Sequence, residues 1–167
     1  MTADDWIERL GLEKHPEGGW FREVYRSAEE LSASALPSRF LVPHPLSTSI
    51  YFLLRGSEFS ALHRLKADEV WHFYAGSPLT LHVIAPDGTL TRTTIRAEGS
   101  AASLQAVVRA GHWFGATVDD TSPESFALAG CTVAPGFIFE DFELGDRVWL
   151  LTQFPQHRVL IEHLTRS

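Results

Sequence analysis

Short runs that alternate apolar and polar residues occupy the middle of the chain, from residue 47 to about residue 133. Each run has the length and the β-branched or aromatic content of a strand, and turn residues such as Gly56 and Gly88 separate one run from the next. The pattern predicts eight strands, at Thr48–Leu54, Glu58–Leu65, Glu69–Tyr74, Leu79–Ile84, Leu90–Ile95, Leu104–Val108, His112–Val118 and Phe126–Val133. Short strands at about ten-residue spacing favour a sandwich or barrel over a sheet with crossover helices.

The two ends of the chain have a different pattern. A strand is predicted at Trp20–Tyr25, and residues 28–45, rich in Ser, Ala and Pro, are predicted to form a long surface loop. Helices are predicted at residues 2–10, at Arg147–Thr152 after a capping Asp146, and from Pro155 to about Leu164. We therefore expect one mainly β domain that spans residues 1–167, with a short N-terminal helix and C-terminal helices.

Composition narrows the class of protein. Apolar residues make up 44% of the chain and charged residues 21%, as in a folded globular protein. The longest apolar run, Ile50–Leu54, is too short to cross a membrane, and the acidic start lacks the apolar segment of a secretory signal. The net charge of -7 argues against binding to nucleic acid. The single cysteine, Cys131, cannot form an intrachain disulfide, so we expect a cytoplasmic protein. The charge and the short apolar runs together predict that neither nucleic acid nor a membrane is a partner.

Histidine is the residue type that points to chemistry, because the chain has eight of them. His63 ends one predicted strand and Glu69 begins the next, so a short turn should bring the two side chains together across a ladder. Residues two apart in a strand share a face. The alternation places an apolar set beside these two side chains: Phe59, Ala61, Leu65, Trp71 and Phe73. It places Ser60 on the opposite, solvated face, so His63 and Glu69 are expected to face one cavity that His112 borders.

The segment from Gly56 to Gly76 resembles the first motif of the cupin superfamily, in which a glycine precedes His-x-His, then a glutamate, then a glycine. His63, Glu69 and Gly76 have that spacing, and Gly56 lies one residue early. Residues 109–114 lie at the distance expected for the second motif. The resemblance implies a double-stranded β-helix, also called a jelly-roll barrel.

The whole chain resembles one branch of that superfamily, the small stand-alone cupins of unknown function. The segments that carry this resemblance are Gly18–Phe21, Glu69–Gly76, Ala110–Phe114 and Ala134–Phe137. The branch implies a homodimer but supplies no activity. A strand with Trp20 and Phe21 would leave an apolar edge exposed on a monomer, which also favours a homodimer.

The chain departs from the cupin pattern at the metal positions. Leu65 stands where the second histidine of His-x-His is expected, and Phe114 where the second motif has its histidine. His63 and Glu69 alone are too few ligands for a tight site for zinc, iron or manganese. The cofactor is therefore either absent or one divalent metal ion, for which His63, Glu69 and His112 would be the ligands.

Three functions remain open. By resemblance to sugar epimerases related to cupins, His63 would be a general base for a sugar-like or keto-acid substrate, and Tyr51 or Tyr74 the acid. Glu69, or an acid from Glu140 and Asp141, would orient His63.

The second function is that of a metal-dependent isomerase, dioxygenase or lyase. The third is small-ligand binding without catalysis, at a site with aromatic walls. The residues expected to bind the ligand are His112, Trp71, Phe73, Phe114 and Glu140. The histidines outside the motifs, His15 and His44 among them, are expected to be solvated or packing residues.

Overall fold

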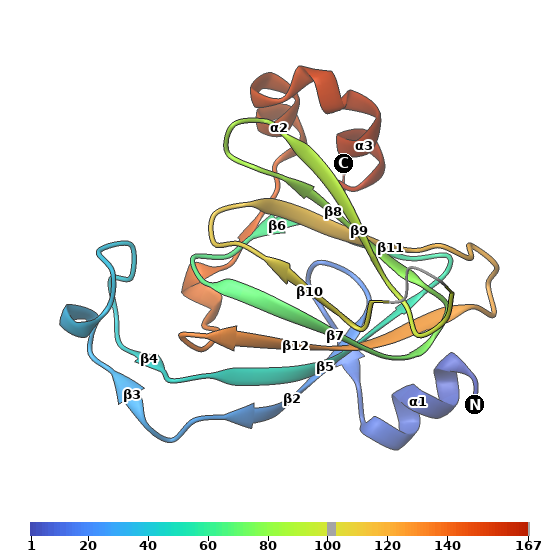
Figure 1. The fold of residues 1–167 in the computed structure, drawn as a ribbon, viewed down its shortest axis with the longest axis horizontal. Helices are drawn as coiled ribbons and strands as arrows, with labels where there is room; N and C mark the ends of the chain where they lie inside the picture. The colour runs from blue at the N-terminus through green and yellow to red at the C-terminus, as the bar shows by residue number, and fades with distance from the viewer. Residues whose placement is uncertain (100–102, 167) are drawn as a thin grey trace.

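Strands dominate the computed structural model of the chain, which describes residues 1–99 and 103–166 (Figure 1). In chain order the elements are α1 (Ala3–Leu10), β1 (Glu13–Lys14), β2 (Trp20–Arg26), β3 (Glu30–Leu31), η1 (Ala33–Ala35), β4 (His44–Pro45), β5 (Thr48–Arg55), β6 (Phe59–Arg64), β7 (Asp68–Gly76), β8 (Leu79–Ile84), β9 (Leu90–Ile95), β10 (Gln105–Val108), β11 (Trp113–Val118), β12 (Phe126–Ala134), η2 (Phe139–Asp141), β13 (Glu143–Leu144), α2 (Arg147–Gln153), η3 (Pro155–His157) and α3 (Arg158–His163). The predicted strands of the middle region are all present, with bounds within two residues of those expected.

Two antiparallel sheets face each other. One sheet has the strand order β1-β2-β5-β12-β7-β10, and the other the order β13-β6-β11-β8-β9. Sequential neighbours such as β8 and β9 pair through a tight turn, whereas β12 pairs with β5 and β7, which lie far earlier in the chain. This sandwich is the predicted jelly-roll barrel.

The main core lies between the two sheets. Phe52 of β5 and Trp71 of β7 meet Phe114 of β11 there, and each of these side chains is at most 2% exposed. The ring centroids of Phe52 and Trp71 are 5.4 Å apart, and those of Trp71 and Phe114 are 6.5 Å apart, both in edge-to-face geometry. Toward one end of the barrel this packing gives way to a cavity, which is described below.

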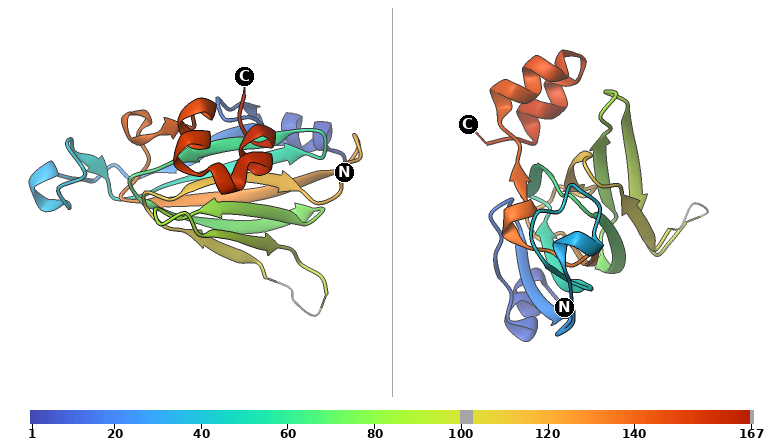
Figure 2. Two further views of the ribbon diagram at one scale, coloured as in Figure 1. Left: turned by 90° about the horizontal axis from the view of Figure 1, so that it is seen from above. Right: turned by 90° about the vertical axis from the view of Figure 1, so that its left-hand side faces the viewer.

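Helices cover the outer faces of the two sheets at opposite ends of the molecule (Figures 1 and 2). A second core joins α2 and α3 to the outer face of the β6-β11-β8 sheet through Leu62, Trp113, Leu150 and Ile161. A third core joins α1 to the outer face of the other sheet. The helix starts were predictable, because Thr2 and Asp5 form a capping box and Asp146 accepts a hydrogen bond from the backbone N–H of Trp149.

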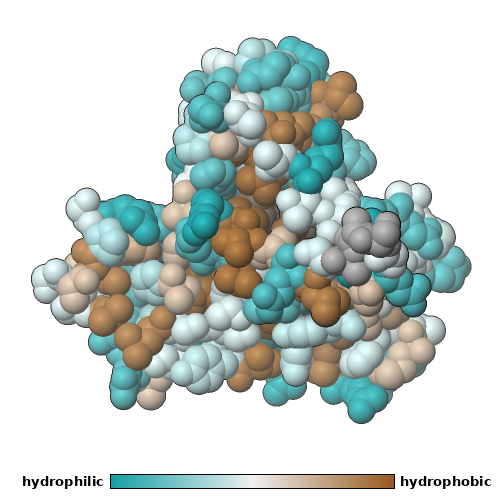
Figure 3. Space-filling model, in the orientation of Figure 1, coloured by the Kyte–Doolittle hydropathy of each residue, from teal (hydrophilic) through white to brown (hydrophobic). Residues whose placement is uncertain are grey.

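The outer face of the six-stranded sheet is partly apolar. Tyr74 of β7 and Val107 of β10 are each 51% exposed, and Val24 of β2 is 47% exposed. On the face presented in Figure 1, apolar patches lie between hydrophilic ones (Figure 3).

Two details differ from the sequence prediction. Residues 28–45 are not a plain loop, because β3 and β4 pair within them and His44 is fully buried. In β6, the register against β11 shifts between His63 and Ser60, so a β-bulge interrupts the alternation of faces. Phe59 therefore packs against the second core, while Ser60 is fully buried and turned toward the barrel interior.

Within the residues that the structure describes, no helix has the length and apolar character needed to cross a bilayer.

Candidate functional site

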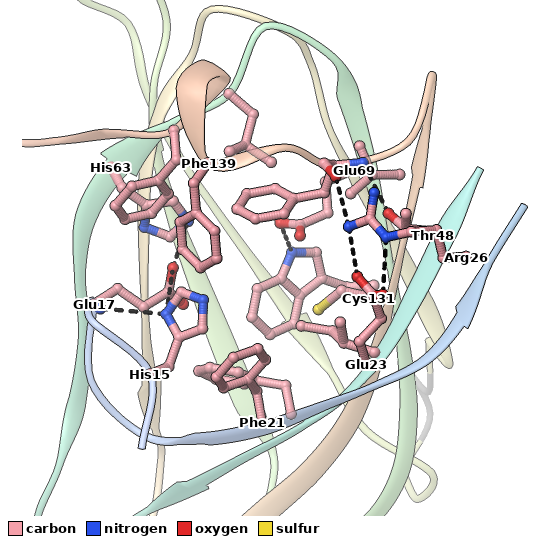
Figure 4. A pocket seen from close by; sticks show the side chains of 17 residues that line it. His15, Glu17, Phe21, Glu23, Arg26, Thr48, His63, Glu69, Cys131 and Phe139 are labelled. Atoms are coloured by element: carbon pink, nitrogen blue, oxygen red, sulfur yellow. Dashed lines mark hydrogen bonds and ion pairs between the residues drawn. The ribbon is translucent and has the colours of Figure 1, made fainter. Parts of the chain in front are cut away.

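A cavity of about 70 Å³ opens at one end of the barrel, between the two sheets. Its wall is mainly apolar and aromatic. Its apolar lining residues are Phe21, Ile50, Phe52, Leu65, Trp71, Val133, Phe137, Phe139 and Phe142. Its polar lining residues are His15, Glu17, Glu23, Arg26, Thr48, His63, Glu69 and Cys131 (Figure 4). A concave apolar site with a few converging polar groups is the usual form of a small-molecule site.

Glu17 enters the barrel from the turn that joins β1 to β2. The backbone carbonyl of Glu17 accepts a hydrogen bond of 2.8 Å from the N–H of Ala61, which fastens this turn to β6. Gly18 has a φ of +113°, and a Cβ there would overlap the carbonyl oxygen of Phe59. The turn can therefore lie against β6, and carry Glu17 inward, only with a glycine at this position.

His63 and Glu17 form a buried pair. His63 Nε2 lies 3.0 Å from Glu17 Oε2, and His63 Nδ1 lies 2.7 Å from the carbonyl oxygen of Ala61. Ser60 donates a hydrogen bond of 2.7 Å to the other oxygen of Glu17. Glu17 Oε2 and the carbonyl oxygen of Ala61 are both acceptors, so each of the two ring nitrogens of His63 must carry a proton. The geometry therefore fits an imidazolium beside a carboxylate.

Charge and burial act against each other in this pair. Burial alone would raise the pKa of Glu17, but the charge and hydrogen bond of His63 hold it below its usual range. Burial lowers the pKa of His63, but the charge and hydrogen bond of Glu17, the hydrogen bond to Ala61 and the charge of Glu69 together outweigh it, so the net shift is upward. Because both ring nitrogens are occupied, His63 has no free lone pair to offer to a ligand.

Glu69 is the first inward-facing residue of β7 and is 7% exposed. The indole Nε1–H of Trp71 donates a hydrogen bond of 2.8 Å to Glu69 Oε2. Burial raises the pKa of Glu69 to about 7, against the opposing effect of the His63 charge. Glu69 is therefore a cavity carboxyl that exchanges its proton near neutral pH.

At the open side of the cavity, a salt bridge between Arg26 and Glu23 forms one wall, and aromatic residues, Phe139 among them, form another. Arg26 Nε and Nη2 donate hydrogen bonds of 2.9 and 2.8 Å to the two carboxylate oxygens of Glu23. Phe139 lies in front of the cavity in Figure 4 and is 56% exposed. The segment that carries Phe139 is held by Asp141, which contacts His44 Nε2 at 2.6 Å and Lys66 Nζ at 2.9 Å.

The structure brings together only some of the residues singled out from the sequence. His63, Glu69 and Trp71 line the cavity. Phe114 and Phe73 are buried in the core, Phe114 with its ring 4.1 Å from that of His63, and neither lines the cavity.

Four others lie outside the cavity. Tyr51 and Tyr74 are on the opposite face of their sheet, with ring centroids 6.1 Å apart, so neither is an acid for this cavity. His112 precedes β11, and its Nδ1 lies 3.3 Å from the carbonyl oxygen of Ala110. Contrary to the prediction, His112 does not line the cavity. Glu140 is exposed and lines an outer cleft beside Arg39 and Lys66.

The lining residues that were not predicted include two that bear directly on the chemistry, Glu17 and His15. Glu17 was not among the predicted site residues, and His15 was expected to be a solvated or packing residue. The signal that could have found them is the pair Gly18-Gly19, since two glycines after a polar residue permit close approach of the backbone to another strand.

The cavity does not fit the metal that cupins often hold. His63 has both ring nitrogens engaged, Leu65 and Phe114 occupy two ligand positions, and His112 lies elsewhere. In the described parts of the chain, no three His, Cys, Asp or Glu side chains are grouped as a metal site. We therefore derive no step through a metal.

The fold and the cavity define a cupin, and comparison with known proteins names the branch. The family model described as the Cupin superfamily (DUF985) matches residues 4–145, so the chain belongs to that family.

Two solved structures cover the whole chain. A crystal structure of a Shewanella oneidensis protein has 41% sequence identity and a TM-score of 0.89, over 100% of this chain and 99% of that one. A hypothetical protein from Leishmania major has 34% identity and a TM-score of 0.87, over the full length of both chains.

More distant similarity shows the fold alone. Oxalate decarboxylase from Bacillus subtilis has 13% identity and a TM-score of 0.54, over 90% of this chain and 36% of that one. No functionally curated protein matches the chain.

Proposed function

We propose that the chain is an acid–base enzyme whose cavity binds a short hydroxy-carbonyl or keto-acid metabolite. In this proposal Glu69 moves a proton to and from the carbon beside the carbonyl, as in an isomerase or epimerase. The observation that carries the proposal is a buried carboxyl that lines the cavity, where burial raises its pKa to about 7. A general base works best when its pKa lies near the working pH.

The two buried carboxyls of the site support different roles. The pKa of Glu17 is lowered by its partner His63, whereas that of Glu69 is raised by burial. Carboxyls in one site whose pKa values are pushed apart commonly divide into a permanent charge and a proton carrier. Glu17 and His63 are then the fixed ion pair, and Glu69 is the base.

The base in this proposal is thus Glu69 and not His63, the residue favoured from the sequence. His63 directs one N–H to Ala61 and the other to Glu17, which leaves it no acceptor. Its positive charge favours the carboxylate form of Glu69 and so keeps the pKa of Glu69 from rising further.

The size of the cavity supports a small substrate. A buried water needs about 10–15 Å³ of such space, so a cavity of about 70 Å³ holds about five to seven groups of that size. That suits a compound of three or four carbon atoms.

The test is exchange of carbon-bound protons with solvent. The protein is incubated in D₂O with pyruvate, 2-oxobutyrate, dihydroxyacetone and glyceraldehyde, and loss of the proton signals beside the carbonyl is followed by NMR. We expect faster exchange for at least one compound, and a loss of at least about 100-fold in Glu69→Gln, since a general base contributes about 10²–10⁴-fold.

Glu143→Gln is the matched control. Glu143 is a carboxyl on β13 that pairs with Arg64 at the surface and does not line the cavity, so its loss should leave exchange unchanged. Binding of these compounds without exchange would instead make the chain a binding protein and refute the enzymatic role.

A further inference from the structure

His15 is a cavity residue whose side chain is 7% exposed, and it has no part in the proton transfer by Glu69 described above. It lines both the cavity and an outer cleft that includes Lys14, Glu58 and Arg166. Its ring is surrounded by phenyl rings, with centroids 4.6 Å away for Phe21, 6.0 Å for Phe142 and 6.2 Å for Phe52. All three contacts are edge-to-face.

The turn fixes which nitrogen of His15 carries the proton. The backbone N–H of Glu17 donates a hydrogen bond of 3.2 Å to His15 Nδ1. Nδ1 also lies 3.5 Å from Glu17 Oε2, but only the N–H contact has hydrogen-bond geometry, so Nδ1 is an acceptor and the proton of the neutral ring sits on Nε2. Figure 4 shows one ring nitrogen directed toward Glu17 and the other toward the middle of the cavity. No described residue accepts a hydrogen bond from Nε2.

The surroundings keep this ring uncharged. Burial lowers the pKa of His15, more than the charge of Glu17 raises it, and the charge of His63 lowers it further. A neutral imidazole whose N–H faces a mainly apolar cavity, and which has no acceptor among the described residues, can donate that hydrogen bond to a bound ligand.

We propose that His15 Nε2–H donates a hydrogen bond to the carbonyl oxygen of the substrate and holds the negative charge that develops there. This inference rests on the proposed function of the same cavity.

Glu69 and His15 are the two side chains that take part in this proton transfer. The Glu69 carboxylate removes the proton from the carbon beside the carbonyl. The electron pair of that C–H bond forms a C=C bond, and the carbonyl oxygen becomes an enolate that accepts the His15 hydrogen bond. Glu69 then returns the proton to carbon. A neutral imidazole can polarise a carbonyl in this way without giving up its proton.

The first test needs no ligand. In ¹⁵N-labelled protein, the His15 ring signals are assigned by their loss in His15→Gln. We expect the neutral ring with the proton on Nε2 at neutral pH. A charged ring at neutral pH, or a proton on Nδ1, would overturn the inference.

The second test uses acetohydroxamate, which is present mainly as its uncharged acid at neutral pH and mimics an enediol. Gln can place an amide N–H near the position of His15 Nε2, whereas Phe fills the space without a donor. We expect His15→Phe to weaken binding at least about 10-fold and to slow proton exchange about 100-fold, the usual effect of removing one donor to an oxyanion. His15→Gln should restore most of both, and melting temperatures verify that each variant is folded.

The two proposals fail in distinguishable ways. Loss of exchange in Glu69→Gln together with unchanged exchange and binding in His15→Phe would overturn the role of His15 alone. A wild-type protein that neither binds acetohydroxamate nor exchanges protons would overturn the proposed function and the role of His15 with it.

Discussion

Glu69 couples the chemistry of the cavity to the stability of the fold. Its pKa rises from the ordinary 4.5 to about 7 in the folded chain, so the folded state binds this proton more tightly than the unfolded state. The stabilising effect of the proton is complete below about pH 4.5 and is lost as the pH rises to about 7. One pKa unit corresponds to about 1.4 kcal/mol, so the loss is about 3 kcal/mol.

Glu69→Gln should remove this pH dependence, because Gln resembles the protonated carboxyl and can still accept the hydrogen bond from Trp71. We expect the variant to match the wild type at pH 4.5 and to be about 3 kcal/mol more stable at pH 8. Urea unfolding at several pH values measures the difference. Equal stability of the two proteins at pH 8 would contradict a raised pKa at Glu69.

Residue spacing predicted part of the site and could not predict the rest. His63 and Glu69 line one cavity as the alternation of faces implied, because the alternation holds from Glu69 to Phe73 in β7 and at the end of β6. The bulge in β6 reversed the faces of Phe59 and Ser60, and nothing in the local sequence marks where the extra residue falls. Glu17 joins the site through a contact with Ser60, 43 positions away, which periodicity does not encode.

At the scale of elements, the turn before β2 positions the ion pair and depends on one glycine. Gly18→Ala should push the turn away from Phe59, because both the positive φ and the overlap with a backbone oxygen oppose a Cβ there. Gly111→Ala is the matched control, with a φ of +78° and open space around the added Cβ.

Both alanine variants carry the strain of a positive φ, so the difference between their losses of stability measures the effect of the overlap with the carbonyl oxygen of Phe59. We expect Gly18→Ala to lose about 1–3 kcal/mol more stability than Gly111→Ala, as overpacked sites do. Thermal and urea unfolding provide the measurement. Equal losses would show that the turn can move without cost.

The sequence predicted secondary structure correctly where alternating runs are joined by a short turn, and it failed where the strands are too short to alternate. The β8–β9 hairpin follows from Pro86, Asp87 and Gly88 between two alternating runs. The small β3–β4 sheet within residues 28–45 was missed, because its two-residue strands carry no alternation.

At the scale of the molecule, the homodimer expected from the sequence stays a prediction. The outer face of the six-stranded sheet offers Val107, Tyr74 and Val24 as exposed apolar side chains. Light scattering at micromolar concentration should give twice the 18.6 kDa mass of one chain.

Two valines allow a controlled test of that face. Val107→Lys should weaken the dimer, since it places a charge on the sheet face. Val159→Lys, at an 81% exposed position on α3, should not. A monomer mass for the wild type, or equal dimers in both variants, would contradict the prediction.

Cys131 is the chain's single cysteine, and it lines the cavity. Burial raises the pKa of its thiol well above the usual value, and the charges of Glu69 and Glu17 raise it further, so the S–H bond persists at neutral pH. The infrared stretch of an S–H bond falls in a spectral window that other protein groups leave clear. The unmodified protein therefore contains one vibrational reporter of its own, at which the electric field changes when Glu69 gains or loses its proton.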